Sequence, residues 1–225
     1  MSKLGAFVRL DFATIKPYFS RKNIMLYIAV MLFLTIMIGE SSFGIVIGIW
    51  IATMFIGYSF TVGDKCNMDA LYVTLSVDRQ TVVLGRYVFT FLLNVCTILS
   101  AYVVATVGIF AAQIAGYASG TEFALWAIIP MVAFILIIQA LQLPLYFRFG
   151  YTKAKFISVL PNIAMIAGIM AFGALNRSTE ISSRIDEFIN PTSSGWLTAG
   201  AVLALCFVVF ISFRLSLAFY RKREF

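Results

Sequence analysis

Long apolar runs, separated by short polar segments, are the feature that most constrains how this 225-residue chain can fold. A helix that crosses a bilayer needs about 20 predominantly apolar residues. Hydrophobic residues make up 61% of the chain and charged residues only 12%, against about 45–50% and about 25% in soluble domains. A bilayer can surround this much apolar surface, whereas one globular core cannot bury it. We therefore expect an all-α polytopic membrane protein that forms a single transmembrane domain.

The apolar runs predict six transmembrane helices. The first run, Ile24–Val62, carries a single charge, Glu40, and is too long for one span. Its turn residues lie near the middle, so we divide it into two spans joined by a tight turn. The second of these contains Gly44 and Gly48, which are spaced for close helix approach. The predicted spans cover residues 21–39, 43–62, 87–115, 123–146, 156–175 and 196–220.

The basic residues orient these spans. Of the 17 Lys and Arg residues, all but Arg177 and Arg184 fall on one side of the predicted membrane. Loops rich in Lys and Arg stay in the cytoplasm, and an even number of spans then places both termini there. The net charge of +7 is spread over short juxtamembrane clusters, which argues against a nucleic-acid partner.

Catalytic chemistry has no clear location in this sequence. Histidine is absent, and there is no GxxxxGK[ST] loop that could hold nucleotide phosphates. We therefore expect neither an enzyme nor a metal site, and no cofactor in this chain. The polar residues inside the predicted spans are neutral, and they serve either as interhelical hydrogen-bonding groups or as substrate ligands: Asn94, Gln113, Gln139, Gln142 and Asn162.

Residues 1–20 have the pattern of an amphipathic helix in the membrane interface. Phe7 and Phe12 belong to its apolar stripe, while Arg9 and Lys16 fall on the opposite face. Asp11 lies inside the apolar stripe, where a carboxylate is unexpected. Either it reaches lipid headgroups, or it pairs with a basic residue of the helix bundle.

Two loops carry further helical patterns. In the cytoplasmic loop 63–86, apolar residues repeat at i, i+3, i+4 and i+7 between Asp64–Lys65 and Asp78–Arg79, and they are Met68, Leu71, Tyr72 and Leu75. This segment either docks on a cytoplasmic partner or packs on headgroups. In the extracellular loop 176–195, one helical face would form a lid over a pathway or a simple interfacial helix: Ile181, Ile185 and Phe188.

The cytoplasmic loop resembles the loop after the second span of small type-2 ABC transporter permeases. Its run Asp64–Tyr87 follows that family's pattern, with Ser76 where proline is usual and Asp78 where a hydroxyl residue is usual. Pro144–Tyr151 followed by Lys153 resembles the family's loop after the fourth span, and Asp11-Phe12 resembles its opening helix.

The resemblance implies a half-size permease that pairs with a second permease, identical or different, and with two cytoplasmic ATPase subunits that bind ATP and Mg²⁺. Residues 1–20, with Phe7, Asp11 and Phe12, would form an elbow helix. Asp64–Arg79 would be the coupling helix that touches the ATPase. A second cytoplasmic contact would comprise Arg148, Tyr151 and Lys153.

Within that family, the chain is similar to permeases that export phenol-soluble modulins and related amphipathic peptides from the bacterial plasma membrane. Other cargoes stay open: a drug, a lipid, or an antimicrobial peptide removed for self-protection. A membrane scaffold or sensor subunit without transport activity is the alternative from another functional class.

Overall fold

A computed structural model describes residues 3–18, 20–38, 41–66, 77–114, 132–150 and 191–222, and the single residues 68, 72, 159, 163 and 167. Within these residues every regular element is helical, as the sequence predicts. The elements are α1 (Lys3–Ile15), the 3-10 turn Lys16–Tyr18, α2 (Arg21–Ile38), α3 (Ser41–Lys65), α5 (Arg79–Ile114), the helix Val132–Gly150, and α8 (Pro191–Arg221).

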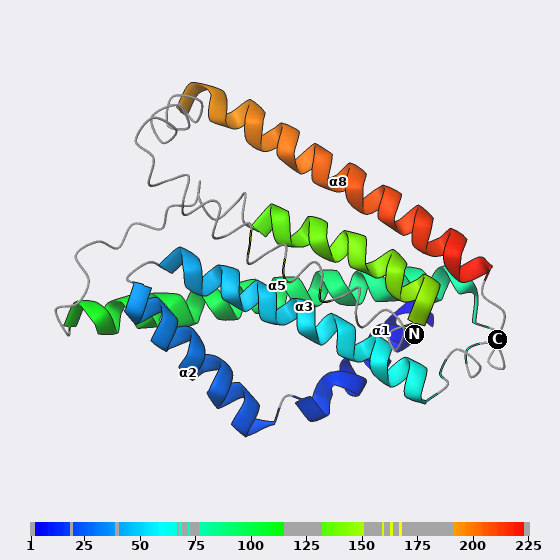
Figure 1. Ribbon diagram of the computed structural model, residues 1–225, viewed down its shortest axis with the longest axis horizontal. Helices are drawn as coiled ribbons and strands as arrows, with labels where there is room; N and C mark the ends of the chain where they lie inside the picture. The colour runs from blue at the N-terminus through cyan, green and yellow to red at the C-terminus, as the bar shows by residue number, and fades with distance from the viewer. Residues whose placement is uncertain are drawn as a thin grey trace.

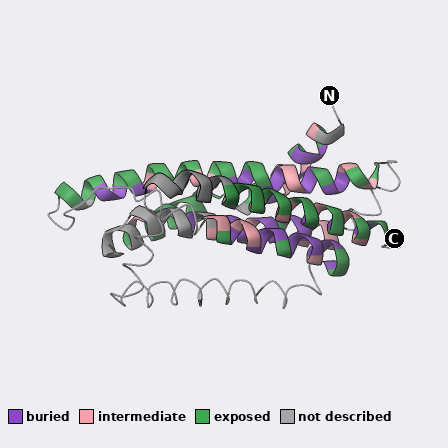
Figure 2. Cartoon of the chain, turned by 90° about the horizontal axis from the view of Figure 1, so that it is seen from above, coloured by how far each residue is buried: buried purple, intermediate pink, exposed green. Residues whose placement is uncertain are grey.

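Helices α3, α5, α8 and Val132–Gly150 run roughly along the long axis of the molecule, and α2 is inclined to them (Figure 1). α5 packs against α1, α2, α3 and α8. The short helix α1 lies at the end of the bundle where α3 and α8 end and α5 begins (Figure 1). Buried residues gather where helices face one another, and exposed residues line their outer sides (Figure 2).

Gly48 in α3 lets three helices approach closely where they cross. A Cβ atom at Gly48 would lie 2.6 Å from the Cβ of Ala101 and 3.1 Å from the hydroxyl of Tyr27. Gly48 therefore marks the place where α2, α3 and α5 meet, as the spacing of Gly44 and Gly48 suggests for this span. Beside this crossing, Met31 and Ala101 belong to a second buried apolar cluster.

Three helices among the described residues are long and apolar enough to cross a membrane: Arg79–Ala111, Val132–Gly150 and Val202–Arg221. They correspond to the predicted third, fourth and sixth spans. Helices α2 and α3 cover the predicted first and second spans, with 18 and 25 residues, and their crossing of the membrane stays a prediction. Of the predicted fifth span, the structure describes only Val159, Ile163 and Ala167, all helical.

Several helices extend beyond the predicted spans. α5 begins at Arg79 rather than at residue 87, and α8 begins at Pro191 rather than at residue 196. The helix predicted to end near residue 146 continues to Gly150, whose φ of 70° suits a helix end. Hydropathy marks only the apolar part of a helix, whereas backbone hydrogen bonds continue into its polar ends. The described helix ends therefore lie inside the predicted loops.

Candidate coupling site at the end of the bundle

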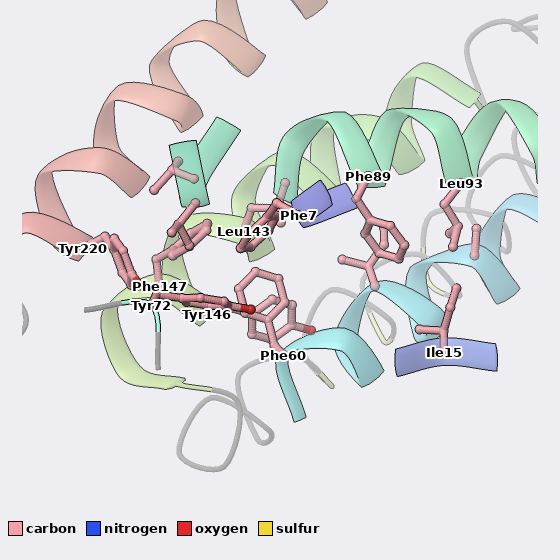
Figure 3. Close-up of a cluster of buried hydrophobic side chains, with 14 residues drawn as sticks. Phe7, Ile15, Phe60, Tyr72, Phe89, Leu93, Leu143, Tyr146, Phe147 and Tyr220 are labelled. Atoms are coloured by element: carbon pink, nitrogen blue, oxygen red, sulfur yellow. The ribbon is translucent and has the colours of Figure 1, made fainter. Parts of the chain in front are cut away.

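Aromatic side chains from several helices meet at the end of the bundle where α1 lies (Figure 3). The ring of Phe60 in α3 is 5.1 Å from Tyr146 and 5.2 Å from Phe147, both in the helix Val132–Gly150. Phe147 in turn lies 5.4 Å from Tyr220 near the end of α8. Ring contacts at these separations favour tilted and edge-to-face pairs, so the cluster fixes the three helix ends relative to one another.

A buried ion pair joins α1 to this cluster. Arg86 Nη1 of α5 lies 2.8 Å from Asp11 Oδ1 of α1, and the two side chains are 6% and 1% exposed. The Arg86 guanidinium lies 4.7 Å from the ring centre of Phe60 and 5.6 Å from that of Phe7, within cation–π range. Of the two alternatives for Asp11, the structure supports pairing with a basic residue of the bundle.

The other amino group of Arg86 faces α3. A Cβ atom at Gly63 would lie 3.3 Å from Arg86 Nη2, so the glycine leaves room for the guanidinium against the end of α3. Arg86, Gly63 and Asp64 line one small pocket together with Phe60, Val82, Tyr146, Phe147 and Tyr220. Its volume of about 20 Å³ is enough for a single water molecule.

Burial raises the pKa of Asp11 from 3.8 to about 6, and the positive charge of Arg86 opposes part of that rise. Desolvation disfavours the charged carboxylate, while an opposite charge nearby favours it. Asp11 is therefore mostly ionised at neutral pH, but it gains a proton in mildly acidic solution. The link between α1 and α5 thus depends on the protonation of one carboxyl group.

The predicted coupling segment is anchored from inside the chain. Tyr72 is 4% exposed, and its ring lies 5.2 Å from that of Phe7 in α1. Its hydroxyl donates a hydrogen bond to the sulfur of Met68 at 3.4 Å. The sequence suggested that this segment docks on a cytoplasmic partner or packs on headgroups, and neither alternative includes this packing of Tyr72 on α1. Of the other predicted coupling residues, Lys65 and Asp78 are exposed, Asp64 and Arg79 are partly buried, and Leu71 and Leu75 lie outside the described residues.

Arg79, at the start of α5, contacts the end of α8. Its Nη1 donates hydrogen bonds to the backbone carbonyls of Tyr220, at 3.4 Å, and of Arg221. The last carbonyls of a helix have no partner within the helix, and a positive charge there is favourable. A residue predicted to touch a partner therefore caps a helix of its own chain.

The predicted second contact lies beside the same helix end. Arg148 is exposed, and its guanidinium lies 4.9 Å from the ring of Phe149 and 5.1 Å from that of Phe219 in α8. Tyr151 and Lys153 lie outside the described residues, as do Ile181, Ile185 and Phe188 of the predicted lid. In the elbow helix, Phe12 packs edge-to-face on Phe89 of α5 at 5.0 Å.

Two polar networks join the helices farther along the bundle. The Asn94 and Gln139 side chains exchange hydrogen bonds of 2.7 and 3.1 Å, and Gln139 also donates to Thr53 at 3.0 Å. All three are at most 5% exposed. For Asn94 and Gln139, the structure therefore supports the role of interhelical hydrogen-bonding groups. Gln142 is also buried, and Gln113 is exposed.

The second network connects α8 to its neighbours. The Tyr87 hydroxyl lies 2.6 Å from that of Ser212 and 2.9 Å from that of Ser216. Ser212 also donates a hydrogen bond to the carbonyl of Ala140. Tyr87, Ser212, Ser216 and Arg86 were not predicted as site residues from the sequence. The carboxylate in an apolar stripe at Asp11 was the one signal for Arg86, because a buried acid needs a cationic partner.

Among the residues that the structure describes, no group of three His, Cys, Asp or Glu side chains could hold a metal ion. The acidic and basic residues buried in this part of the chain are Asp11 and Arg86. The site at the end of the bundle therefore holds helices in position through one ion pair and a set of aromatic contacts.

Comparison with known proteins assigns the chain to a family. A family model described as ABC-2 family transporter protein matches residues 7–221, which includes α1, the coupling segment and α8. A search of curated proteins and a search of solved structures found no match. The match covers nearly the whole chain and agrees with its apolar helices. The chain therefore belongs to the ABC-2 family transporter proteins, the membrane components of ABC transporters.

Proposed function

We propose that the chain is a half-size permease that exports amphipathic peptides, such as phenol-soluble modulins, together with a second permease and two cytoplasmic ATPase subunits. Family membership across residues 7–221 supports the permease part of this proposal. In such an assembly, ATP and Mg²⁺ bind to the ATPase subunits, and this chain provides the path through the membrane.

The convergence of the predicted cytoplasmic segments at one end of the bundle is the observation that carries the proposal. The end of α3, the start of α5 and the ends of the helix Val132–Gly150 and α8 line one pocket. Exposed charges border this region at Lys65, Asp78 and Arg148. A cytoplasmic ATPase docked there would touch every helix end in the cluster at once.

The topology that we propose has six spans with both termini in the cytoplasm. Helix α1 and the end of α8 lie at the same end of the bundle (Figure 1), as an even number of crossings requires. The distribution of Lys and Arg points the same way. The membrane would then be the bacterial plasma membrane.

The chemistry of the bundle interior supports an amphipathic cargo. Away from the Asp11–Arg86 pair, the buried polar side chains of the described residues are all neutral. Ion-coupled carriers usually place Asp, Glu or His along their path, so a small ion is a poorer fit than a peptide with a large apolar face. A drug, a lipid or an antimicrobial peptide would share this chemistry and is tested in the same assay.

Co-purification tests the ATPase partner. We would reverse two exposed charges, Lys65→Glu and Asp78→Lys, and purify the tagged permease from its own cells in a mild detergent. Reversed charges repel a complementary partner and lower its association, so less P-loop ATPase should be recovered per permease. Lys22→Glu is the matched control, because Lys22 is exposed at the start of α2. Equal ATPase recovery from all variants contradicts docking at this surface.

Transport in inverted vesicles tests the cargo. Vesicles that contain the complex should accumulate a fluorescent phenol-soluble modulin when ATP is added, and vesicles without the permease should not. Accumulation of a labelled lipid or drug, but not of the peptide, would replace the proposed cargo. A complex without any ATPase would favour the scaffold or sensor alternative.

A further inference from the structure

We propose that Arg86 is a positioning residue for energy coupling, which transmits movement of the ATPase-facing segment into α5 through its ion pair with Asp11. The inference rests on the proposed function, and it assigns roles to residues that the family resemblance leaves without one. Its basis is a continuous series of contacts from the coupling segment to the centre of the bundle.

The series begins at Tyr72. Its buried ring packs on Phe7 of α1, 5.2 Å away, so a force on the coupling segment is passed to the elbow helix. Asp11 follows Phe7 by one helical turn, and it holds Arg86 of α5 at 2.8 Å. Helix α5 then packs along α2, α3 and α8, so its displacement reaches most of the described bundle.

Arg86 is placed to receive movement from two helices. Its Nη1 faces Asp11 of α1, and its Nη2 lies near Gly63 in the last turn of α3. The planar guanidinium presents donors in a fixed fork. A shift of either helix end changes the position of this fork, and the buried side chain connects the fork to the second turn of α5.

Stability alone is a weak reason to bury this pair. Removing two charges from water costs more than their attraction returns unless the geometry is excellent, and apolar replacements often fold at least as well. Here the two atoms are 2.8 Å apart, yet Arg86 Nη1 and both oxygens of Asp11 lack a well-aligned hydrogen bond. A pair with such loose alignment contributes little to stability, but it still fixes which part of α1 faces α5.

The remaining contacts between α1 and α5 are apolar, such as Phe12 on Phe89. Hydrophobic contact is non-directional, whereas the ion pair joins one group of α1 to one group of α5. It therefore adds a directional link to the packing of Phe7 against Gly85. Without this link, the packing alone would not carry a movement of the coupling segment into α5.

The test uses the purified permease–ATPase complex and a single thiol at the far end of α5. Gln113 is exposed in the last turn of that helix, beyond the apolar stretch Arg79–Ala111, so Gln113→Cys is combined with Cys66→Ser, Cys96→Ser and Cys206→Ser. We would measure the N-ethylmaleimide labelling rate at position 113 with and without ATP plus vanadate, alongside ATP hydrolysis. In the protein with an intact ion pair, nucleotide should change the rate by about fivefold or more, as for typical coupling between sites.

Asp11→Asn keeps the shape of the side chain but removes its charge. It should assemble and hydrolyse ATP within about twofold of the parent, while the labelling response at position 113 disappears. Asp11→Glu keeps the charge and should restore the response. A response in Asp11→Asn equal to that of the parent overturns the positioning role. Parallel loss of assembly, hydrolysis and response, with no rescue by Asp11→Glu, also overturns it, because that result shows a purely structural contact.

The two proposals fail in different ways. If no ATPase accompanies the parent permease, the proposed function fails and the coupling role fails with it. If the ATPase is present and active but Asp11→Asn still transmits the nucleotide signal, only the role of Arg86 fails. Because the labelling assay needs no cargo, an error in the proposed cargo affects neither result.

Discussion

The ring of Phe7 in α1 occupies the space that a side chain at Gly85 in α5 would need. A Cβ atom at residue 85 would lie closer to Cδ1 of that ring than real atoms approach, and 3.0 and 3.1 Å from its Cε1 and Cγ. Because Gly85 has no side chain, the ring of Phe7 in α1 fits beside α5 next to Arg86. Phe7 therefore packs on α5 at Gly85, and its ring also contacts Tyr72 of the predicted coupling segment.

Gly85→Ala should therefore loosen α1 from α5. Overpacking of a filled site costs about 1–3 kcal/mol, and we expect a lower unfolding temperature in detergent. Gly200→Ala is the matched control, since a Cβ atom there meets no other atom within 4 Å and alanine favours helix over glycine. Equal melting temperatures for the two variants would contradict the close contact of Phe7 and Gly85.

The raised pKa of Asp11 predicts a pH-dependent stability. Because the pKa is about 6 in the folded chain and 3.8 in the reference state, the fold favours the protonated carboxyl. This contribution is fully present below pH 3.8 and is lost as the pH rises through 6. The shift corresponds to about 3 kcal/mol at most.

Asp11→Asn removes this titration. The variant should melt at or above the temperature of the parent at pH 7.5, and the difference should shrink as the pH falls toward 4.5. Melting curves of both proteins at half-unit pH steps in one detergent provide the measurement. A difference in melting temperature that stays constant over this range would show that Asp11 does not titrate there.

The amide pair of Asn94 and Gln139 should show measurable coupling. Asn94→Leu alone leaves buried polar atoms of Gln139 with fewer partners, which costs about 1–3 kcal/mol. Exchanging both residues for leucine removes the polar atoms together and should cost less than the sum of the single changes. Interhelical hydrogen bonds in membranes average about 0.6 kcal/mol, with a maximum of about 1.7.

A double-mutant cycle measured by unfolding in mixed micelles gives this coupling energy. Gln113→Leu is a suitable control because Gln113 is exposed on α5. Strict additivity of the two single changes would mean that the Asn94–Gln139 contact does not contribute to stability.

Arg79 should hold the end of α8. Arg79→Ala removes the donor to the carbonyls of Tyr220 and Arg221, and charges at helix C-termini contribute about 0.3–1 kcal/mol. We expect faster amide hydrogen exchange in the last turns of α8, with α2 unchanged. Arg79→Lys keeps the charge and should restore part of the protection. Exchange rates in α8 that stay the same in Arg79→Ala would contradict the cap.

Periodicity and hydropathy predicted much of this fold from the sequence. The division of the run Ile24–Val62 into two helices agrees with α2 and α3, and the apolar stripe containing Phe7 and Phe12 predicted α1. Such local patterns repeat within one element and need no knowledge of neighbours. The helix ends at Arg79 and Gly150 were missed because polar residues in a helix look the same as polar residues in a loop.

The site was less accessible from the sequence. Asp11 and Arg86 are 75 positions apart, and no local pattern shows which cation a buried acid meets. Of the apolar face predicted for the coupling segment, the structure describes a buried Tyr72 and a partly buried Met68, and the sequence did not indicate what Tyr72 contacts. A hydrophobic side chain is equally suited to lipid, to a second protein or to its own chain, and only the fold places Tyr72 on Phe7.

The two hydroxyls that meet Tyr87 have a further consequence for α8. Ser212 and Ser216 are one helical turn apart, and both reach the same phenol. If α8 moved lengthwise by one turn, one serine would replace the other and the phenol would keep a partner. A shift by one turn would keep only one of the two hydrogen bonds, so the phenol favours the present register of α8. The cap from Arg79 and the ring contact of Phe147 with Tyr220 hold the same register at the end of the helix.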